Sequence, residues 1–325
     1  MPPILRVDGA LERLAEPPLT SDEVREIAES LLSATEIARL SAEGDVSTAW
    51  SHQNLGRTRA HLYGSQQGLT IAVRLLDAKV PSLESLGLPE ALSALSQRER
   101  GLVILAGPTG SGKSTTMAAL VDRINAQHAR RIVTIEDPIE YRHESRRSIV
   151  TQRAIGRDTP SLGAALRGIL RADPDVIVVG EMRDADSMAG ALTAAETGHL
   201  VLTTLHTGDA AQTVERIVDA FSGALQGQIR AQLAQALVAV ACQYLARRAS
   251  GSGRRAVVEL LVGTDAVRNL IRESKAHQLK NAMSTGRRFG MQTFEQHAAE
   301  LVRDREIDLA EARRLGFGDD GRTVA

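Results

Sequence analysis

Residues 107 to 115 have the composition and spacing of a phosphate-binding loop, because they read Gly-Pro-Thr-Gly-Ser-Gly-Lys-Ser-Thr. Glycines in this pattern let the backbone curl so that several N–H groups point at one anion. The Lys113 ammonium suits the β- and γ-phosphates, and the Ser114 hydroxyl suits Mg²⁺. The predicted nucleotide-binding residues are Gly107, Pro108, Thr109, Gly110, Ser111, Gly112, Lys113, Ser114 and Thr115. These residues predict a site for a nucleoside triphosphate.

A second residue that could take part in a reaction is Glu181, which follows the apolar run at residues 176–179. A strand that ends in a carboxylate would deliver negative charge to the edge of the sheet where the phosphate loop lies. There Glu181 could orient the hydration shell of Mg²⁺ opposite Ser114. An ordinary strand end with a solvated glutamate is the competing interpretation.

An acidic stretch follows the apolar run at residues 132–135 and contains Glu136, Asp137 and Glu140. Hydrolysis needs a base that orients and deprotonates water in line with the γ-phosphate. Each of the three carboxylates is a candidate, and spacing alone does not choose among them. The alternative is an acidic turn at the surface.

Two further groups gain interest only beside a nucleotide site. His206 ends the apolar run at 200–205 and could sense the γ-phosphate or bridge to a neighbouring subunit, although a histidine at a strand end is more often structural. Arg57, Arg59 and Arg74 lie in a predicted hairpin. They would be read as solvated charges unless an arginine is needed to neutralise charge in the transition state.

Composition narrows the class of protein. The 325 residues are 43 % hydrophobic and 24 % charged, with a net charge of −1, which gives no electrostatic reason to expect nucleic acid as a partner. Aromatic residues make up 2 %, too few for the stacking platforms of a protein that binds single-stranded nucleic acid.

The single cysteine, Cys242, lies in an apolar run and is predicted to be buried. With no membrane-spanning stretch or signal peptide recognised, we expect a cytoplasmic protein without direct membrane insertion.

The order of predicted elements indicates an α/β protein with a second, smaller part. Residues 1–80 are predicted to form an α+β domain, 81–92 a linker, 93–262 the core that contains the phosphate loop and 263–325 a helical subdomain. Within the core, short β-branched runs alternate with helical stretches, which predicts a largely parallel sheet covered by helices. The expected strands are 102–106, 131–136, 175–180 and 199–204, and the expected helices between them are 114–127, 161–171 and 184–196.

Taken together, these stretches resemble the type II/IV secretion and pilus ATPase superfamily, and most of all its type IV pilus retraction members, along essentially the whole chain. Residues 134–140 resemble the family's aspartate box, and 180–184 its variant Walker B motif. Residues 195–199 and 204–207 resemble its histidine box. Residues 266–273 are similar to a C-terminal signature of the retraction members, with Val267 in place of isoleucine.

The resemblance implies a RecA-like core with a PAS-like N-terminal domain, ATP and Mg²⁺ as cofactors, and a cytoplasmic homo-hexameric ring at the inner membrane. It makes Glu140 the general base, Glu181 the organiser of Mg²⁺ and water, and His206 a γ-phosphate-linked residue. Arg59 and Arg74 become sensors or arginine fingers. The partners it implies are an inner-membrane platform protein and a second retraction ATPase.

Two departures from the family pattern are expected to matter. The family usually carries a helix and strand before the Pro2-Pro3 position, so either the start codon is placed late or the small domain lacks an edge strand. Ala154 stands where a glutamate is typical, which removes one ion pair near the site.

The competing functions are a pilus-assembly or secretion ATPase, a nucleic-acid motor, and an accessory ring member that binds ATP without hydrolysing it. Assembly members commonly carry a four-cysteine insertion, which this sequence lacks.

Overall fold

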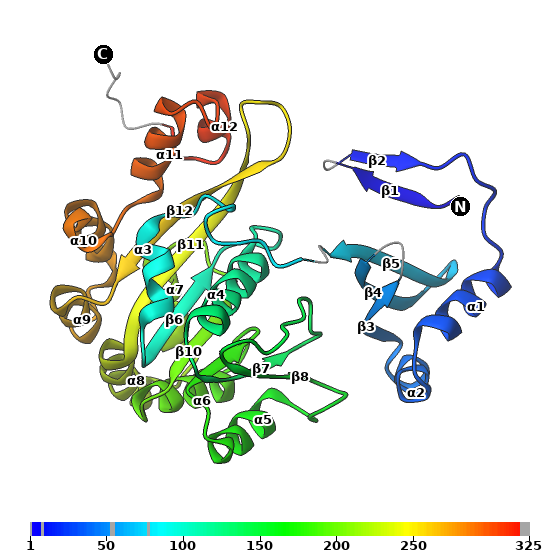
Figure 1. Ribbon diagram of the computed structural model, residues 1–325, viewed down its shortest axis with the longest axis horizontal. Helices are drawn as coiled ribbons and strands as arrows, with labels where there is room; N and C mark the ends of the chain where they lie inside the picture. The colour runs from blue at the N-terminus through cyan, green and yellow to red at the C-terminus, as the bar shows by residue number, and fades with distance from the viewer. Residues whose placement is uncertain (1, 8–9, 53–55, 77–78, 319–325) are drawn as a thin grey trace. The chain divides into compact units, whose positions relative to one another are not determined.

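The computed structural model describes residues 2–7, 10–52, 56–76 and 79–318, which form two compact units, Met1–Lys79 and Val80–Ala325 (Figure 1). Each unit has its own hydrophobic core. No helix among the described residues is long and apolar enough to cross a bilayer.

The first unit is an α+β fold. A hairpin of β1 (Ile4–Val7) and β2 (Ala10–Arg13) precedes α1 (Ser21–Leu31) and α2 (Ala34–Glu43). An antiparallel sheet follows, in the order β3 (Asp45–His52), β4 (Gly56–Ser65) and β5 (Gly68–Leu76).

The helix starts of this unit follow from local chemistry. Thr20 and Ser33 each accept a hydrogen bond from the backbone N–H three residues on, while Glu23 and Glu36 accept bonds from the cap residues. Such capping boxes satisfy N–H groups that have no partner within the helix. The sequence at residues 20–23 predicts such a helix start, because a Thr-Ser pair precedes two acidic residues, and the structure confirms it. The sequence also predicts a turn at Asp8 and Gly9, which lie outside the described residues.

The second unit contains a seven-stranded sheet in the order β12-β11-β6-β10-β9-β7-β8. All neighbouring pairs are parallel except β11 and β12. The strands are β6 (Gly101–Ala106), β7 (Arg131–Glu136), β8 (Ile149–Ala154), β9 (Val176–Val179), β10 (Leu200–Leu205), β11 (Leu237–Arg247) and β12 (Arg254–Val262). The sheet is therefore mixed, and its parallel part matches the prediction.

Helices cover both faces of this sheet (Figure 1). The helices are α3 (Glu90–Ser93), α4 (Lys113–Gln127), α5 (Leu162–Ile169), α6 (Ala185–Glu196), α7 (Ala210–Asp219), α8 (Gly223–Ala236), α9 (Asp265–Arg272), α10 (Leu279–Thr285), α11 (Phe294–Arg303) and α12 (Leu309–Arg314). Along β6, Leu102 and Ile104 join one buried cluster, whereas Val103 and Leu105 join the other. This alternation is the reason that the central strand reads as a continuous apolar run.

The elements that the sequence did not predict have identifiable causes. β11 begins at Leu237, directly after α8 ends at Ala236, so no turn residue separates helix from strand. An apolar run without such a boundary does not distinguish the two. β8 reads Ile-Val-Thr-Gln-Arg-Ala, without a continuous apolar run, and lies at the edge of the sheet, where Ile149 is exposed.

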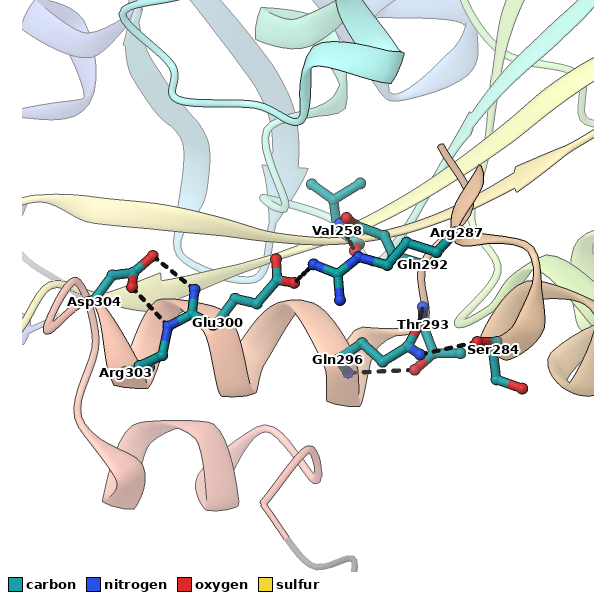
Figure 2. Close-up of polar contacts among 9 residues, drawn as sticks. All are labelled: Val258, Ser284, Arg287, Gln292, Thr293, Gln296, Glu300, Arg303 and Asp304. Carbon is teal, nitrogen blue, oxygen red and sulfur yellow. Dashed lines mark hydrogen bonds and ion pairs between the residues drawn. The ribbon is translucent and has the colours of Figure 1, made fainter. Parts of the chain in front are cut away.

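The outer edge of β12 is closed by the C-terminal segment rather than by another strand. The Gln292 side chain donates a hydrogen bond to the Val258 carbonyl, and the Val258 N–H donates to Nδ1 of His297 at 2.9 Å. Figure 2 shows Gln292 beside Val258, and Gln296 closing the N-terminus of α11 at Thr293. These bonds occupy backbone groups that an open strand edge would leave unpaired.

His297 gives the fold a predictable dependence on pH. Burial, aided by the charge of Arg255, lowers the pKa of His297 to about 4. Because an unfolded histidine titrates near pH 6.5, the gap between the two pKa values corresponds to about 3 kcal/mol of unfolding free energy. This stabilisation is complete above pH 6.5 and is lost as the pH falls towards about 4.

The measurement is the unfolding midpoint of the wild type and of His297→Gln between pH 4 and 7.5. Glutamine can accept the Val258 N–H but does not titrate, so the wild type should gain stability relative to the variant as the pH rises. Burial raises the pKa of Glu259 to about 7, so its titration lowers the stability of the fold as the pH rises, opposite to the effect of His297. Both proteins contain Glu259, so the comparison between them cancels its contribution. Parallel curves for the two proteins would contradict this role of His297.

Candidate functional site

The phosphate loop, residues 107–112, joins the end of β6 to the first residue of α4, Lys113. Its backbone requires glycine at two points. Gly107 has φ of 139°, and a Cβ there would lie 2.4 Å from the Gln243 carbonyl oxygen. Gly112 caps α4 with φ of 90°. Both conformations are ones that other residues rarely adopt, so the loop shape follows from these glycines.

Gln243 supports the loop from the neighbouring strand β11. Its side chain is 1 % exposed, and its Nε2 donates to the Ser111 carbonyl at 2.6 Å. Its Oε1 accepts from the Thr116 hydroxyl at 3.1 Å. Sequence reasoning missed this residue, although an amide directly after the apolar run at 237–242 was a visible signal.

Lys113 is buried at the base of the loop. Its Nζ donates to the carbonyl oxygens of Gly107 at 2.7 Å and Pro108 at 2.9 Å, and lies 3.4 Å from Nδ1 of His206. Burial lowers the pKa of Lys113, while the charge of Glu181 acts in the opposite direction. The ammonium therefore lies among neutral acceptors that phosphate oxygens could replace.

The hydroxyls of the loop lie in different surroundings. The Ser111 Oγ is buried and has no hydrogen-bond partner among the described residues. Ser114 is exposed at the start of α4. The Thr115 Oγ1 lies 3.0 Å from the Tyr141 hydroxyl, which links the first turn of α4 to the acidic stretch after β7.

Glu181 and His206 follow the ends of β9 and β10, which pair in parallel as neighbours. Parallel pairing brings their carboxyl ends to the same edge of the sheet, and the His206 Nε2 lies 3.4 Å from the Glu181 Oε1. The other carboxylate oxygen, Oε2, accepts a hydrogen bond from the Arg183 Nε at 2.9 Å. These residues line a cavity of about 360 Å³ that Arg216 of α7 also borders. The sequence motifs contained Arg183, but its contact with Glu181 was not foreseen.

The three candidate bases after β7 differ in their surroundings. The Glu136 Oε1 accepts bonds from the Thr134 hydroxyl at 2.7 Å and from the Gln152 Nε2 at 3.1 Å. Desolvation raises the pKa of Glu136 against these hydrogen bonds. Asp137 is exposed and Glu140 is partly buried. Ala154, opposite Glu136 in the register of β7 and β8, is buried and contributes no charge.

The arginines predicted as sensors belong to the unit Met1–Lys79, whereas the phosphate loop belongs to Val80–Ala325. Arg59 on β4 lies directly opposite Arg74 on β5 in the antiparallel register. Arg59 is partly buried and Arg74 is exposed. The side chain of Arg57 lies outside the described part of the chain.

A larger cavity of about 790 Å³ lies elsewhere in the second unit, and no phosphate-loop residue lines it. Three of its polar side chains have structural partners: His297 accepts the Val258 N–H, and Arg287 pairs with Glu300 (Figure 2). Of these two cavities, the smaller one is therefore the one that predicted site residues line, namely Glu181 and His206.

The chain is similar to known proteins along nearly its whole length. The type IV pilus retraction ATPase PilT of Pseudomonas aeruginosa is 42 % identical over 315 residues, covering 96 % of this chain and 91 % of that protein. A twitching motility protein of Neisseria gonorrhoeae is 41 % identical over 312 residues, covering 96 % and 83 % of the two chains.

A solved structure shows the same likeness in three dimensions. The crystal structure of the pilus retraction motor PilT with bound ADP superposes with a TM-score of 0.86 at 42 % identity, covering 97 % of this chain and 90 % of that one. The profile of the family described as type II/IV secretion system protein matches residues 4–314. The chain belongs to the type II/IV secretion system protein family.

Proposed function

We propose that this chain is the ATP-hydrolysing subunit of a homo-hexameric motor that retracts type IV pili. The observation that carries the proposal is the meeting of Lys113, Glu181 and His206 beside the phosphate loop. A cation for phosphate and a carboxylate for metal and water are groups that phosphoryl transfer uses, and the His206 imidazole lies between them. Relatives named for pilus retraction and twitching motility match nearly the whole chain, which favours retraction over assembly.

The residues present fit a nucleotide held with Mg²⁺. Lys113 and the loop N–H groups would hold the phosphates, while Ser114 and Glu181 would hold the cation directly or through water. Mg²⁺ usually keeps several waters and takes one or two protein groups besides phosphate oxygens. The described residues contain no cluster of three or more metal-binding side chains, which agrees with such a shared site. When bound, the cation would neutralise charge on the transferred phosphoryl group.

Glu140 is the carboxylate that we propose as general base. The Glu136 Oε1 accepts hydrogen bonds from Thr134 and Gln152, so this carboxylate has structural contacts within the sheet, whereas the position of Glu140 in the motif at residues 134–140 gives it the role of base. Tyr141 contacts Thr115, so the residue next to Glu140 is tied to the start of α4. His206 would respond to the γ-phosphate through its contact with Lys113.

The ring and its surroundings belong to the same proposal. Arg59 and Arg74 would neutralise phosphate charge at a site shared between subunits. The motor would act in the cytoplasm at the inner membrane, on a platform protein and alongside a second retraction ATPase. The alternative of an assembly or secretion ATPase lacks the support of a four-cysteine metal site, since the sequence has one cysteine.

The experiment that tests this function is Mg²⁺-dependent ATP turnover per subunit, measured as the protein concentration is raised. Shared sites should make turnover rise steeply through the concentration range in which rings form, and Lys113→Ala should abolish it. Flat turnover with intact ATP binding would contradict a ring that is active by itself. Turnover that persists in Lys113→Ala would contradict the phosphate-loop assignment.

Removing the proposed base should slow hydrolysis without removing binding. Glu140→Gln is expected to lower the maximal ATP turnover on the order of 10² to 10⁴-fold, because water would lose its proton acceptor. Nucleotide affinity should stay within about threefold of the wild type, since the base contributes to the transition state more than to binding. The matched control is Glu144→Gln, the same change at an exposed position in the same segment. Normal turnover in Glu140→Gln would contradict its role as the base and leave Asp137 as the next candidate.

Gln243 should matter for nucleotide affinity although it lies behind the loop. Gln243→Leu would leave the buried Ser111 carbonyl and the Thr116 hydroxyl without their partner. An unpaired buried polar group costs about 1–3 kcal/mol, and part of this cost would appear as a less ordered phosphate loop. We expect roughly tenfold weaker ADP binding by calorimetry. Gln228→Leu, at an exposed position on α8, is the control. Equal affinity in the two variants would show that the loop holds its shape without Gln243.

A further inference from the structure

The Glu181 carboxylate is engaged at both of its oxygens by side chains of the same unit. Arg183 donates from Nε to Oε2 at 2.9 Å, and the His206 Nε2 lies 3.4 Å from Oε1. Glu181 is only 26 % exposed, so this carboxylate has little access to solvent. A cation that approaches Glu181 must therefore compete with groups that already contact it.

These contacts continue to the phosphate loop. His206 uses its other ring nitrogen, Nδ1, to approach the Lys113 Nζ at 3.4 Å, and Lys113 donates to the Gly107 and Pro108 carbonyls. A chain of polar contacts thus runs from Arg183 through Glu181 and His206 to Lys113. In this arrangement the groups suited to metal and phosphate neutralise one another.

Arg183 has a second carboxylate within electrostatic reach. The hydrogen bond with Glu181 raises the pKa of Arg183, and the charge of Asp137 acts in the same direction. Asp137 belongs to the acidic stretch after β7, next to Glu136 and near the proposed base Glu140. The Arg183 side chain is 65 % exposed, which leaves the guanidinium room to turn towards solvent when Glu181 takes another partner.

We propose that Arg183 is a positioning residue that holds Glu181 away from the catalytic cation, and that the arrival of Mg²⁺ with nucleotide releases the guanidinium from Glu181. Lys113, His206 and Glu181 would then remain in contact with one another until nucleotide phosphates and Mg²⁺ take their place. The inference rests on the proposed function, because it requires Mg²⁺ and a nucleotide at the phosphate loop. Arg183 would not touch the reacting atoms.

The test is the Mg²⁺ dependence of binding of a fluorescent ADP analogue to the full-length chain. Arg183→Gln removes the competitor for Glu181, so half-maximal binding should need about two- to fivefold less Mg²⁺, the range expected from a partly exposed ion pair. Binding without Mg²⁺, in the presence of a chelator, should be unchanged. Arg183→Lys keeps the charge and should remain close to the wild type.

A matched control separates this contact from a general effect of charge. Arg216 borders the same cavity, but in the described part of the chain it makes no ion pair with Glu181. Arg216→Gln should therefore leave the Mg²⁺ midpoint near that of the wild type. Equal shifts in Arg183→Gln and Arg216→Gln, or a higher Mg²⁺ requirement in Arg183→Gln, would overturn the proposal.

The outcomes also distinguish this inference from the proposed function. In one outcome the wild type binds the analogue with a clear Mg²⁺ dependence while Arg183→Gln has the same Mg²⁺ midpoint. That result would overturn the role of Arg183 alone. A wild type that binds no nucleotide at any Mg²⁺ concentration would overturn the proposed function, and the inference with it. If both Arg183 variants lose the binding of the analogue that the wild type shows in the presence of a chelator, Arg183 has a structural role instead.

Discussion

Parallel pairing of β6, β10, β9 and β7 is the constraint on which the site depends. Neighbouring parallel strands end at the same edge of the sheet, so whatever follows each strand is brought together there. The phosphate loop follows β6, His206 follows β10, Glu181 follows β9 and the acidic stretch follows β7. The chemistry thus comes from four separate segments, and one hydrogen-bond pattern places them.

The charges at this edge are arranged to satisfy one another. Lys113 donates to carbonyls of its own loop, and Glu181 contacts Arg183 and His206. Unpaired buried charge is costly, so a site proposed to hold phosphate and metal needs other partners for its charged groups when neither is bound. Under the proposed function, binding would exchange one set of partners for another. Such exchange links nucleotide binding to side-chain position, which a motor requires at the start of each cycle.

The C-terminal helices have a separate structural task. They close the edge strand β12 through Gln292 and His297, and they add Phe294, Ala298 and Leu301 to the largest buried cluster. β12 in turn pairs with β11, which carries Gln243 beneath the phosphate loop. The support of the nucleotide site therefore extends through two strands to helices near the end of the described chain.

The sequence by itself determined the features that depend on neighbouring residues. The glycines and Lys113 of the phosphate loop, the helix caps at Thr20 and Ser33, and the strands that end at Glu181 and His206 all follow from local spacing and composition. Only the tertiary structure decided which distant groups meet. Gln243 contacts Ser111 across 132 positions, and His206 reaches Lys113 across 93, distances along the chain over which no local rule acts. The order of strands makes those contacts, because it places residues by their position at a sheet edge rather than by their position in sequence.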